Sequence, residues 1–118
     1  MEFQGDETWA CYCHCDDWRR NCGAPVVAFI GVKLDKFAWT GKAPRHYVSS
    51  KGVKRHFCDN CGSPMGFEAD HNEGEIHVYA ASLAHPEIFE PKFHVHAEEN
   101  LPWLRIEDAL PRHDKSIT

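Results

Sequence analysis

Six cysteines are the residues most able to do chemistry in this 118-residue sequence. They occur in two groups, at positions 11, 13, 15 and 22 and at positions 58 and 61. In the second group, two intervening residues allow both thiolates to face one point, and Gly62 allows the turn that a metal knuckle needs. A redox dithiol is the alternative, but that motif usually opens a helix, whereas Cys58 follows a strand-like stretch. The spacing therefore favours a structural metal.

The first group alternates along the chain. In an extended strand, Cys11, Cys13 and Cys15 all point to one face, so one strand can present two or three thiolates. Together with the later pair at positions 58 and 61, two of them supply the four sulfurs that structural zinc requires. Cys22 is more simply explained as a small buried apolar residue.

Charge and hydropathy limit the partners of the chain. Acidic residues outnumber basic ones by 18 to 13, giving a net charge of −5, and no basic run exceeds Arg19-Arg20. We therefore expect no binding to nucleic acid or to an anionic membrane surface. The longest apolar stretch, residues 24–32, is too short to cross a bilayer. Because the N-terminus shows no secretion signal, we expect a cytoplasmic protein whose thiols stay reduced.

Hydrophobic patterning predicts a single, mainly β domain over residues 1–118, after a polar and poorly ordered lead-in at residues 1–8. Strands are expected near residues 9–15, 26–32, 37–40, 46–50, 53–57, 65–69, 75–80 and 93–96. The stretch 26–32 is apolar on both faces, which is typical of a central strand, and 93–96 resembles an edge strand. Helical structure is limited to short turns at 18–21 and 106–110.

Several segments together carry a family resemblance. They are Cys13-His14-Cys15 with Arg19-Arg20, Gly23-Ala24-Pro25, Tyr47 with Ser49-Ser50, the run from Arg55 to Pro64, Ala81-Ser82-Leu83 with Pro86, His94, and Pro102-Trp103. In this order, over about residues 11–113, the chain resembles the glutathione-dependent formaldehyde-activating enzyme family, also described as the centromere-protein-V/GFA domain. The resemblance implies an Mss4-like fold of short antiparallel strands around zinc. It also implies a carbon–sulfur lyase that condenses glutathione, or a similar thiol, with formaldehyde.

The chain departs from the family pattern at two places. The family usually has an opening CxCG strand that shares a structural zinc with the later CxxC pair, and nothing upstream of Thr8 matches it. The family's second site is CxCxxC, and its third cysteine would fall at Trp18, which cannot ligate zinc.

Three arrangements would still give a metal site. The favoured one joins Cys13 and Cys15 to the later pair, which keeps four sulfurs with the least rearrangement. Alternatively, a register shift uses Cys11 with Cys13, or Cys22 replaces the lost ligand from one helical turn beyond Trp18. A fourth outcome is the loss of both metal sites, with packing alone holding the core.

The resemblance also assigns roles around the first cysteine group. Cys13, Cys15 and His14 become catalytic residues beside an open zinc position that lowers the pKa of the glutathione thiol. Arg19 and Arg20 become a clamp for a glutathione carboxylate. The simpler interpretation places His14 on the opposite face of its strand and leaves the arginines as solvated charges.

Two functions therefore follow from the sequence. The first is a zinc-dependent lyase acting on a small thiol and an aldehyde. The second is a non-catalytic, zinc-stabilised binding module with a degraded catalytic metal site, which the tryptophan at position 18 favours. In either case, a missing opening strand would leave an unpaired sheet edge through which a homodimer could form.

Overall fold

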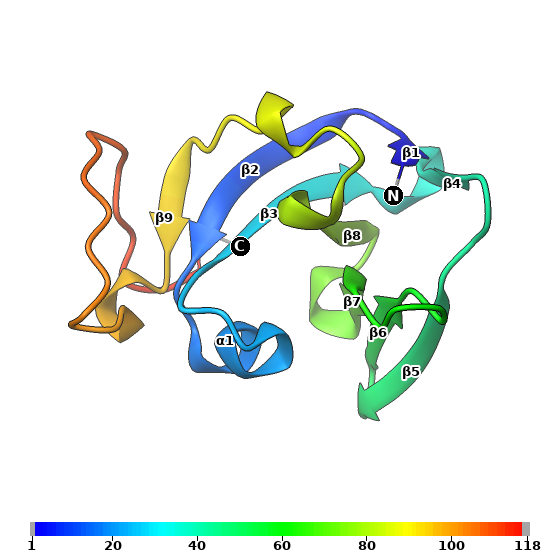
Figure 1. Cartoon of the computed structure of the whole chain (residues 1–118), viewed down its shortest axis with the longest axis horizontal. Helices are drawn as coiled ribbons and strands as arrows, with labels where there is room; N and C mark the ends of the chain where they lie inside the picture. The colour runs from blue at the N-terminus through cyan, green and yellow to red at the C-terminus, as the bar shows by residue number, and fades with distance from the viewer. Residues whose placement is uncertain (1, 117–118) are drawn as a thin grey trace.

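The computed structural model describes residues 2–116 and shows a mainly β protein with one α-helix (Figure 1). Its strands are β1 (Glu2–Gln4), β2 (Glu7–Cys13), β3 (Val27–Lys33), β4 (Ala38–Thr40), β5 (Arg45–Ser50), β6 (Val53–Phe57), β7 (Pro64–Ala69), β8 (Glu75–Tyr79) and β9 (Phe93–Val95). Seven strands form one sheet in the order β5-β6-β7-β8-β3-β2-β9, and β1 pairs with β4. The helix, α1 (Asp16–Cys22), follows β2 directly. The predicted mainly β class is confirmed.

β3 is an interior strand of the large sheet, antiparallel to β8 on one side and to β2 on the other. Its aromatic and β-branched side chains cover both faces, so Phe29 packs into one core cluster and Ile30 into the other. This confirms the prediction of a central strand near residues 26–32.

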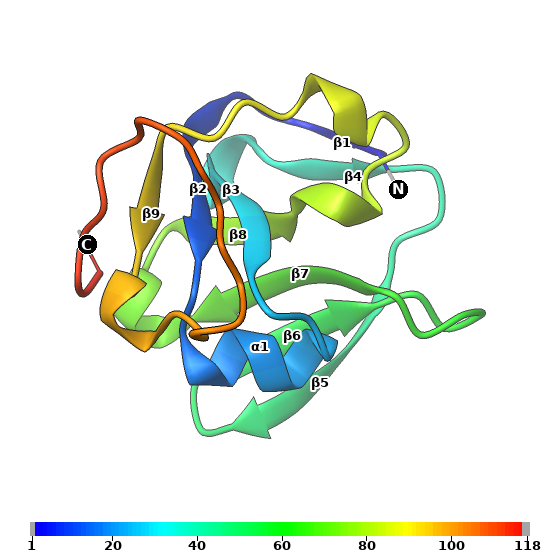
Figure 2. The same ribbon diagram turned by 60° about the vertical axis from the view of Figure 1, so that its left-hand side comes forward.

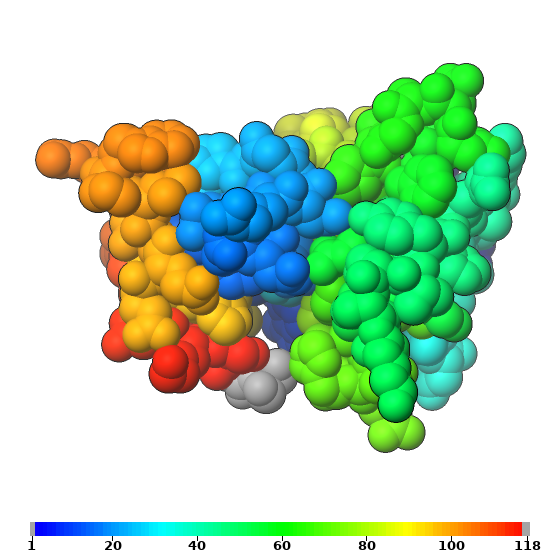
Figure 3. Space-filling view, turned by 90° about the horizontal axis from the view of Figure 1, so that it is seen from below, coloured from blue at the N-terminus to red at the C-terminus, as the bar shows by residue number. Residues whose placement is uncertain are grey.

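The sheet separates two hydrophobic clusters. One contains the cysteines of β2 and a group of aromatic residues, namely Trp18, Phe29, Phe67 and Tyr79. The other is aliphatic and contains Ile30, Val32, Ile76 and Val78. Seen from below, α1 (blue) lies between the orange C-terminal region and the green hairpins (Figure 3). The helix therefore covers the aromatic cluster, to which it contributes Trp18.

The prediction of a poorly ordered lead-in is wrong for residues 2–4, 7 and 8. Residues 2–4 form β1, with Phe3 opposite Trp39 of β4, and β2 already begins at Glu7. The reason is a distant aromatic partner, since Phe3 stacks on Phe37 with 5.4 Å between ring centroids. Burial of two aromatic rings offsets the conformational entropy lost by an otherwise polar segment.

The C-terminal segment is extended, so the predicted helical turn at 106–110 is also wrong. The segment runs beside β9, where the His94 N–H donates to the carbonyl of Pro111 and the His113 N–H donates to the carbonyl of His94, both at 2.9 Å. A five-residue helix would have to nucleate for very few internal hydrogen bonds, whereas pairing with β9 satisfies the backbone directly. The edge strand predicted near 93–96 is confirmed as β9, which lies parallel to β2.

Within residues 2–116, no helix is long and apolar enough to cross a membrane. The α-helix that the structure describes has only seven residues.

Gly31 of β3 provides a test of this packing, because the indole of Trp9 lies where a side chain would begin. A Cβ atom at position 31 would lie well inside van der Waals contact of that ring. We expect Gly31→Ala to lower the free energy of unfolding by about 1–3 kcal/mol, measured by urea denaturation. Gly66→Ala is the matched control, since its Cβ would lie 3.3 Å from Trp39 and needs only a small shift. Equal stability of the two variants would contradict the close approach of the Trp9 indole to Gly31.

Candidate functional site

Three thiols lie on one side of the sheet, two on β2 and one just after it, as the alternation in the sequence predicts. Cys11, Cys13 and Cys15 all belong to the aromatic cluster. They line a cleft of about 280 Å³ whose walls include Trp9, Trp18, Phe29, Phe67, His77 and Phe93. Two larger hollows, of about 550 and 530 Å³, contain no cysteine. We call the first one the cysteine cleft, since thiol chemistry can occur in it.

The three thiols of the cysteine cleft differ in acidity. Cys15 is the N-cap of α1, where the backbone N–H of Trp18 donates to its Sγ at 3.4 Å. A hydrogen bond from the Cys13 thiol, helped by this N–H, lowers the pKa of Cys15. The same hydrogen bond and burial raise the pKa of Cys13, and burial raises the pKa of Cys11 to about 12. Cys15 is therefore the thiol that most readily becomes a thiolate.

Trp18, at the position of the family's third cysteine, is part of the aromatic core. Its indole stacks on Phe29, with 4.3 Å between ring centroids and 10° between ring planes, and it packs against Phe67. Only 7% of the residue is exposed. An indole provides no ligand for zinc, so a hydrophobic contact takes the place of a metal–sulfur bond.

The favoured four-sulfur zinc site is not formed. Cys58 and Cys61 lie in the turn between β6 and β7, which projects away from the end of β2 that carries Cys13 and Cys15 (Figure 2). Three strands, β7, β8 and β3, separate β6 from β2 in the sheet. Across residues 2–116, no three His, Cys, Asp or Glu side chains are grouped so that they could hold a metal ion.

The other two arrangements are not formed either. Cys11 and Cys13 acquire no further ligand among the described residues. Cys22 lines a separate small hollow with Tyr79, outside the cysteine cleft, and does not replace Trp18. A catalytic zinc requires three protein ligands and an open position. The residues of the cleft do not fit such a zinc.

His14 lies on the other face of β2 from the cysteines, as the simpler interpretation of the sequence predicts, but it is buried rather than exposed. Its Nε2 lies 2.8 Å from Nδ1 of His94, and His94 Nε2 lies 2.9 Å from Oδ2 of Asp108. Burial lowers the pKa of His14 to about 4. The catalytic role predicted for His14 has no support in this geometry, because the residue does not line the cleft.

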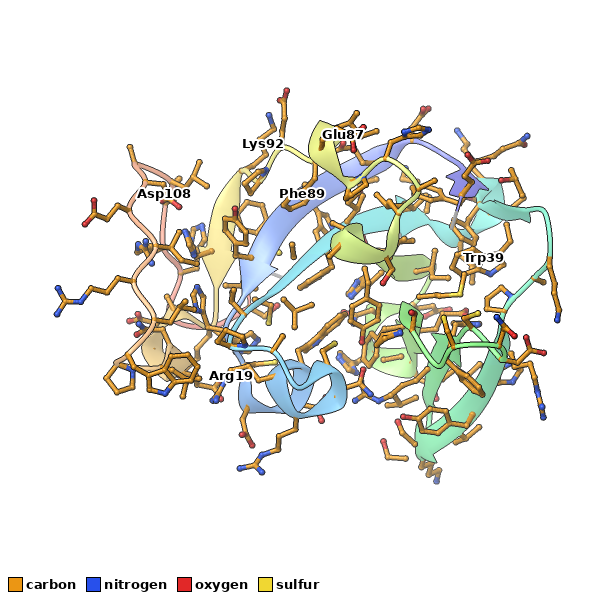
Figure 4. All side chains as sticks on the ribbon, in the orientation of Figure 1. Arg19, Trp39, Glu87, Phe89, Lys92 and Asp108 are labelled. Atoms are coloured by element: carbon orange, nitrogen blue, oxygen red, sulfur yellow. The ribbon has the colours of Figure 1, made fainter. Side chains whose placement is uncertain are left out.

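Neither arginine lines the cysteine cleft. Arg19, labelled in Figure 4, uses its Nε to donate to the carbonyl of His14 at 2.9 Å, which ties α1 to the end of β2. Arg20 is exposed and pairs with Asp16 at 2.7 Å, on the helix surface. Both arginines therefore make contacts that stabilise the helix. The predicted clamp for a glutathione carboxylate stays a prediction, and neither arginine lies beside the thiols of the cleft.

His77 is a site residue that the sequence patterns missed. It alternates with Ile76 and Val78 of β8 and so faces the aromatic side, where it lines the cleft. Its Nε2 lies 3.4 Å from Oε1 of Glu75, and Trp9 Nε1 donates to the other Glu75 oxygen at 3.1 Å. Alternation along the strand could have placed His77 on the face opposite to that of Ile76. Nothing in the sequence indicates which strands pack beside that face.

Comparison with known proteins agrees with this architecture. The family described as glutathione-dependent formaldehyde-activating enzyme matches residues 1–99. A crystal structure of a Rhodobacter sphaeroides protein from a structural genomics programme shares the fold. Its TM-score is 0.54 at 20% identity, over 70% of this chain and 78% of the other. No curated protein matches the chain. Because the family match covers most of the sequence, the chain belongs to the glutathione-dependent formaldehyde-activating enzyme family.

Proposed function

We propose that this chain binds a small thiol such as glutathione together with formaldehyde in the cysteine cleft and joins them through a carbon–sulfur bond. Family membership supports the substrate class. The observation that carries the proposal is the presence, in one cleft, of an acidic thiol, Cys15, and a histidine whose Nδ1 is free to accept a proton, His77.

His77 has the surroundings of a general base. The Glu75 carboxylate accepts a hydrogen bond from Nε2–H of His77, which leaves the lone pair on Nδ1. Nδ1 is buried and has no hydrogen-bond partner among the described residues. Burial lowers the pKa of His77, so the imidazole is neutral near pH 7. A buried acceptor without a partner costs about 1–3 kcal/mol of folding free energy. The S–H group of a thiol bound in the cleft would donate a hydrogen bond to Nδ1 and so remove this cost.

The proposed reaction balances without a cofactor. The thiol proton passes to Nδ1 of His77, the sulfur attacks the carbonyl carbon, and the π-electron pair moves to oxygen. Cys11, whose thiol stays protonated because its pKa is about 12, donates a proton to that oxygen and regains one from the imidazolium. Cys15, the thiol of the cleft whose pKa is lowered, stabilises the imidazolium whenever it is ionised, because solvent screens little in these aromatic surroundings. The product is the S-hydroxymethyl adduct of the thiol.

A non-catalytic binding module is the second candidate, and a specific observation favours it. Trp18 fills the position of the family's third cysteine and packs into the core, so the cleft lacks the ligands for a catalytic zinc. In that case the same cleft would bind the thiol without accelerating its addition to formaldehyde.

An assay of formaldehyde consumption with glutathione separates the two candidates. We expect the wild-type protein to accelerate the reaction, and His77→Phe to lower kcat by about 10²- to 10⁴-fold because the general base is lost. Phenylalanine suits the site sterically, since His77 already stacks on Phe29 with 5.2 Å between ring centroids. Cys22→Ser is the control, because Cys22 is a thiol outside the cleft.

A metal chelator should leave the wild-type rate unchanged. A rate abolished by chelation would contradict the proposed reaction in favour of metal chemistry. Absence of any acceleration, with glutathione still quenching the fluorescence of Trp9 and Trp18, would support the binding module.

The neutral state of His77 also predicts a pH dependence of stability. Because the folded protein lowers the pKa of His77 from 6.5, the unfolded chain binds the proton more tightly. The contribution to stability is therefore complete above the unfolded pKa and is lost as the pH falls towards the folded value. We expect the free energy of unfolding, measured in urea, to decrease between about pH 7 and pH 5, and to decrease less in His77→Phe. Equal decreases in the two proteins would show that His77 is not held neutral by the fold.

A further inference from the structure

A buried arginine lies where α1 faces the β5–β6 hairpin. Arg55, in the middle of β6, is opposite Tyr47 of β5 and Phe67 of β7, so the three side chains form a row across the strands. The guanidinium lies over the Phe67 ring, 5.0 Å from its centroid, and only 9% of the Arg55 side chain is exposed. A cation buried to this extent requires partners for its polar atoms.

The partners of Arg55 leave one end of the guanidinium unsatisfied. Nε donates to the Ser49 hydroxyl oxygen at 2.9 Å, and Nη2 donates to Oδ2 of Asp17 on α1 at 2.7 Å. Nη1 also carries N–H donors, but it is buried and has no hydrogen-bond partner in the part of the chain that the structure describes. Because the Asp17 side chain is 70% exposed, solvent screens its charge, and it offsets the buried cation only in part.

A hollow of about 190 Å³ adjoins this arginine, and we call it the Arg55 hollow. Arg55, Tyr47 and Asn21 supply its polar lining, while Phe57 and Pro64 supply apolar walls. Figure 2 shows α1, which carries Asn21, alongside β6 and β5. Neither Arg55 nor Tyr47 lines the cysteine cleft, so the two sites are separate.

The second donor in the Arg55 hollow is the hydroxyl of Tyr47. The Asn21 side chain is oriented by Tyr79, whose hydroxyl donates to Asn21 Oδ1 at 2.7 Å. Asn21 Nδ2 therefore faces Tyr47 and donates to its hydroxyl oxygen at 3.4 Å. Since that oxygen acts as the acceptor, the hydroxyl hydrogen of Tyr47 is available to a ligand.

These groups define the chemistry of a ligand. The N–H groups of Arg55 Nη1 and the O–H of Tyr47 are donors, and a planar carboxylate presents two acceptor oxygens to such a pair. The neighbouring carboxylate of Asp17 would repel a dianion such as phosphate more strongly than a monoanion. The volume of the hollow equals that of roughly six water molecules, so the ligand has only a few heavy atoms.

We propose that the Arg55 hollow binds the carboxylate of a small free organic acid, of the size of formate or acetate. One carboxylate oxygen accepts from Nη1 of Arg55 and the other from the hydroxyl of Tyr47. The carbon end of the acid packs against Phe57 and Pro64. Binding supplies the acceptor that the buried Nη1 lacks, which gives the hollow its preference for an anion.

The proposal is tested by titrating the protein with sodium acetate at constant ionic strength, with sodium chloride as the replaced salt. We expect the NMR signal of the Arg55 Nε–H group to shift saturably with acetate and not with chloride. Tyr47→Phe removes one donor, and it should weaken acetate binding by about 2- to 10-fold. Tyr12→Phe removes a tyrosine hydroxyl outside the hollow and should keep the wild-type affinity.

Arg55→Lys keeps the positive charge but lacks Nη1, so acetate should no longer raise its Tm as it does for the wild type. If this buried variant does not fold, Tyr47→Phe still carries the test. No saturable shift, an unchanged affinity in Tyr47→Phe, or tighter binding of inorganic phosphate than of acetate would each overturn the proposal. Displacement of acetate by an equal concentration of S-methylglutathione would overturn the assignment to a free acid, in favour of a peptide carboxylate. None of these results measures formaldehyde consumption, so the proposed function stands or falls separately.

Discussion

The stacking of Trp18 on Phe29 is the contact on which the site depends. It fixes α1 against the sheet, and it thereby sets Cys15 at the start of the helix, where the Trp18 N–H donates to its Sγ. The same two rings form the walls around His77, whose ring lies 6.1 Å from Trp18 and 5.2 Å from Phe29 between centroids. Desolvation by these rings keeps the imidazole neutral. One apolar contact therefore occupies the position of the family's third cysteine and desolvates the histidine that we propose as the general base.

The opposite face of β2 is held by polar contacts. His14, His94 and Asp108 form a continuous row of hydrogen bonds that joins β2 to β9 and to the C-terminal segment. Asp108 is labelled in Figure 4 in this segment. The hydrogen bond from His94 lowers the pKa of Asp108, which keeps it ionised. Because the buried His14 and His94 would be costly without partners, their hydrogen bonds to each other and to the exposed Asp108 help to determine where the C-terminal segment lies.

The two groups of cysteines lie in different surroundings. Cys13 and Cys15 are enclosed among aromatic rings, where solvent is scarce and differences in acidity are large. Cys58 and Cys61 lie in the turn between β6 and β7, where Cys58 is half-buried and Cys61 is exposed. From their spacing alone, the two groups were predicted to form one metal site, because any two pairs of cysteines can supply four sulfur ligands. Their burial and their separation across the sheet assign them to different sites.

What the sequence determined by itself is local. Alternation predicted that Cys11, Cys13 and Cys15 lie on one side, although the strand itself ends at Cys13. Uninterrupted apolar residues predicted the central strand, because both patterns depend only on neighbours along the chain. The family resemblance was also readable, since it rests on motifs in order.

Only the tertiary structure decided which motifs meet. The order of strands places β7, β8 and β3 between the two cysteine groups, and packing brings His77 to the cleft and Phe3 to Phe37. Such contacts join residues far apart in sequence, and their free energy comes from surfaces that exist only once the sheet has assembled. The spacing of residues along the chain therefore does not show which distant residues come into contact.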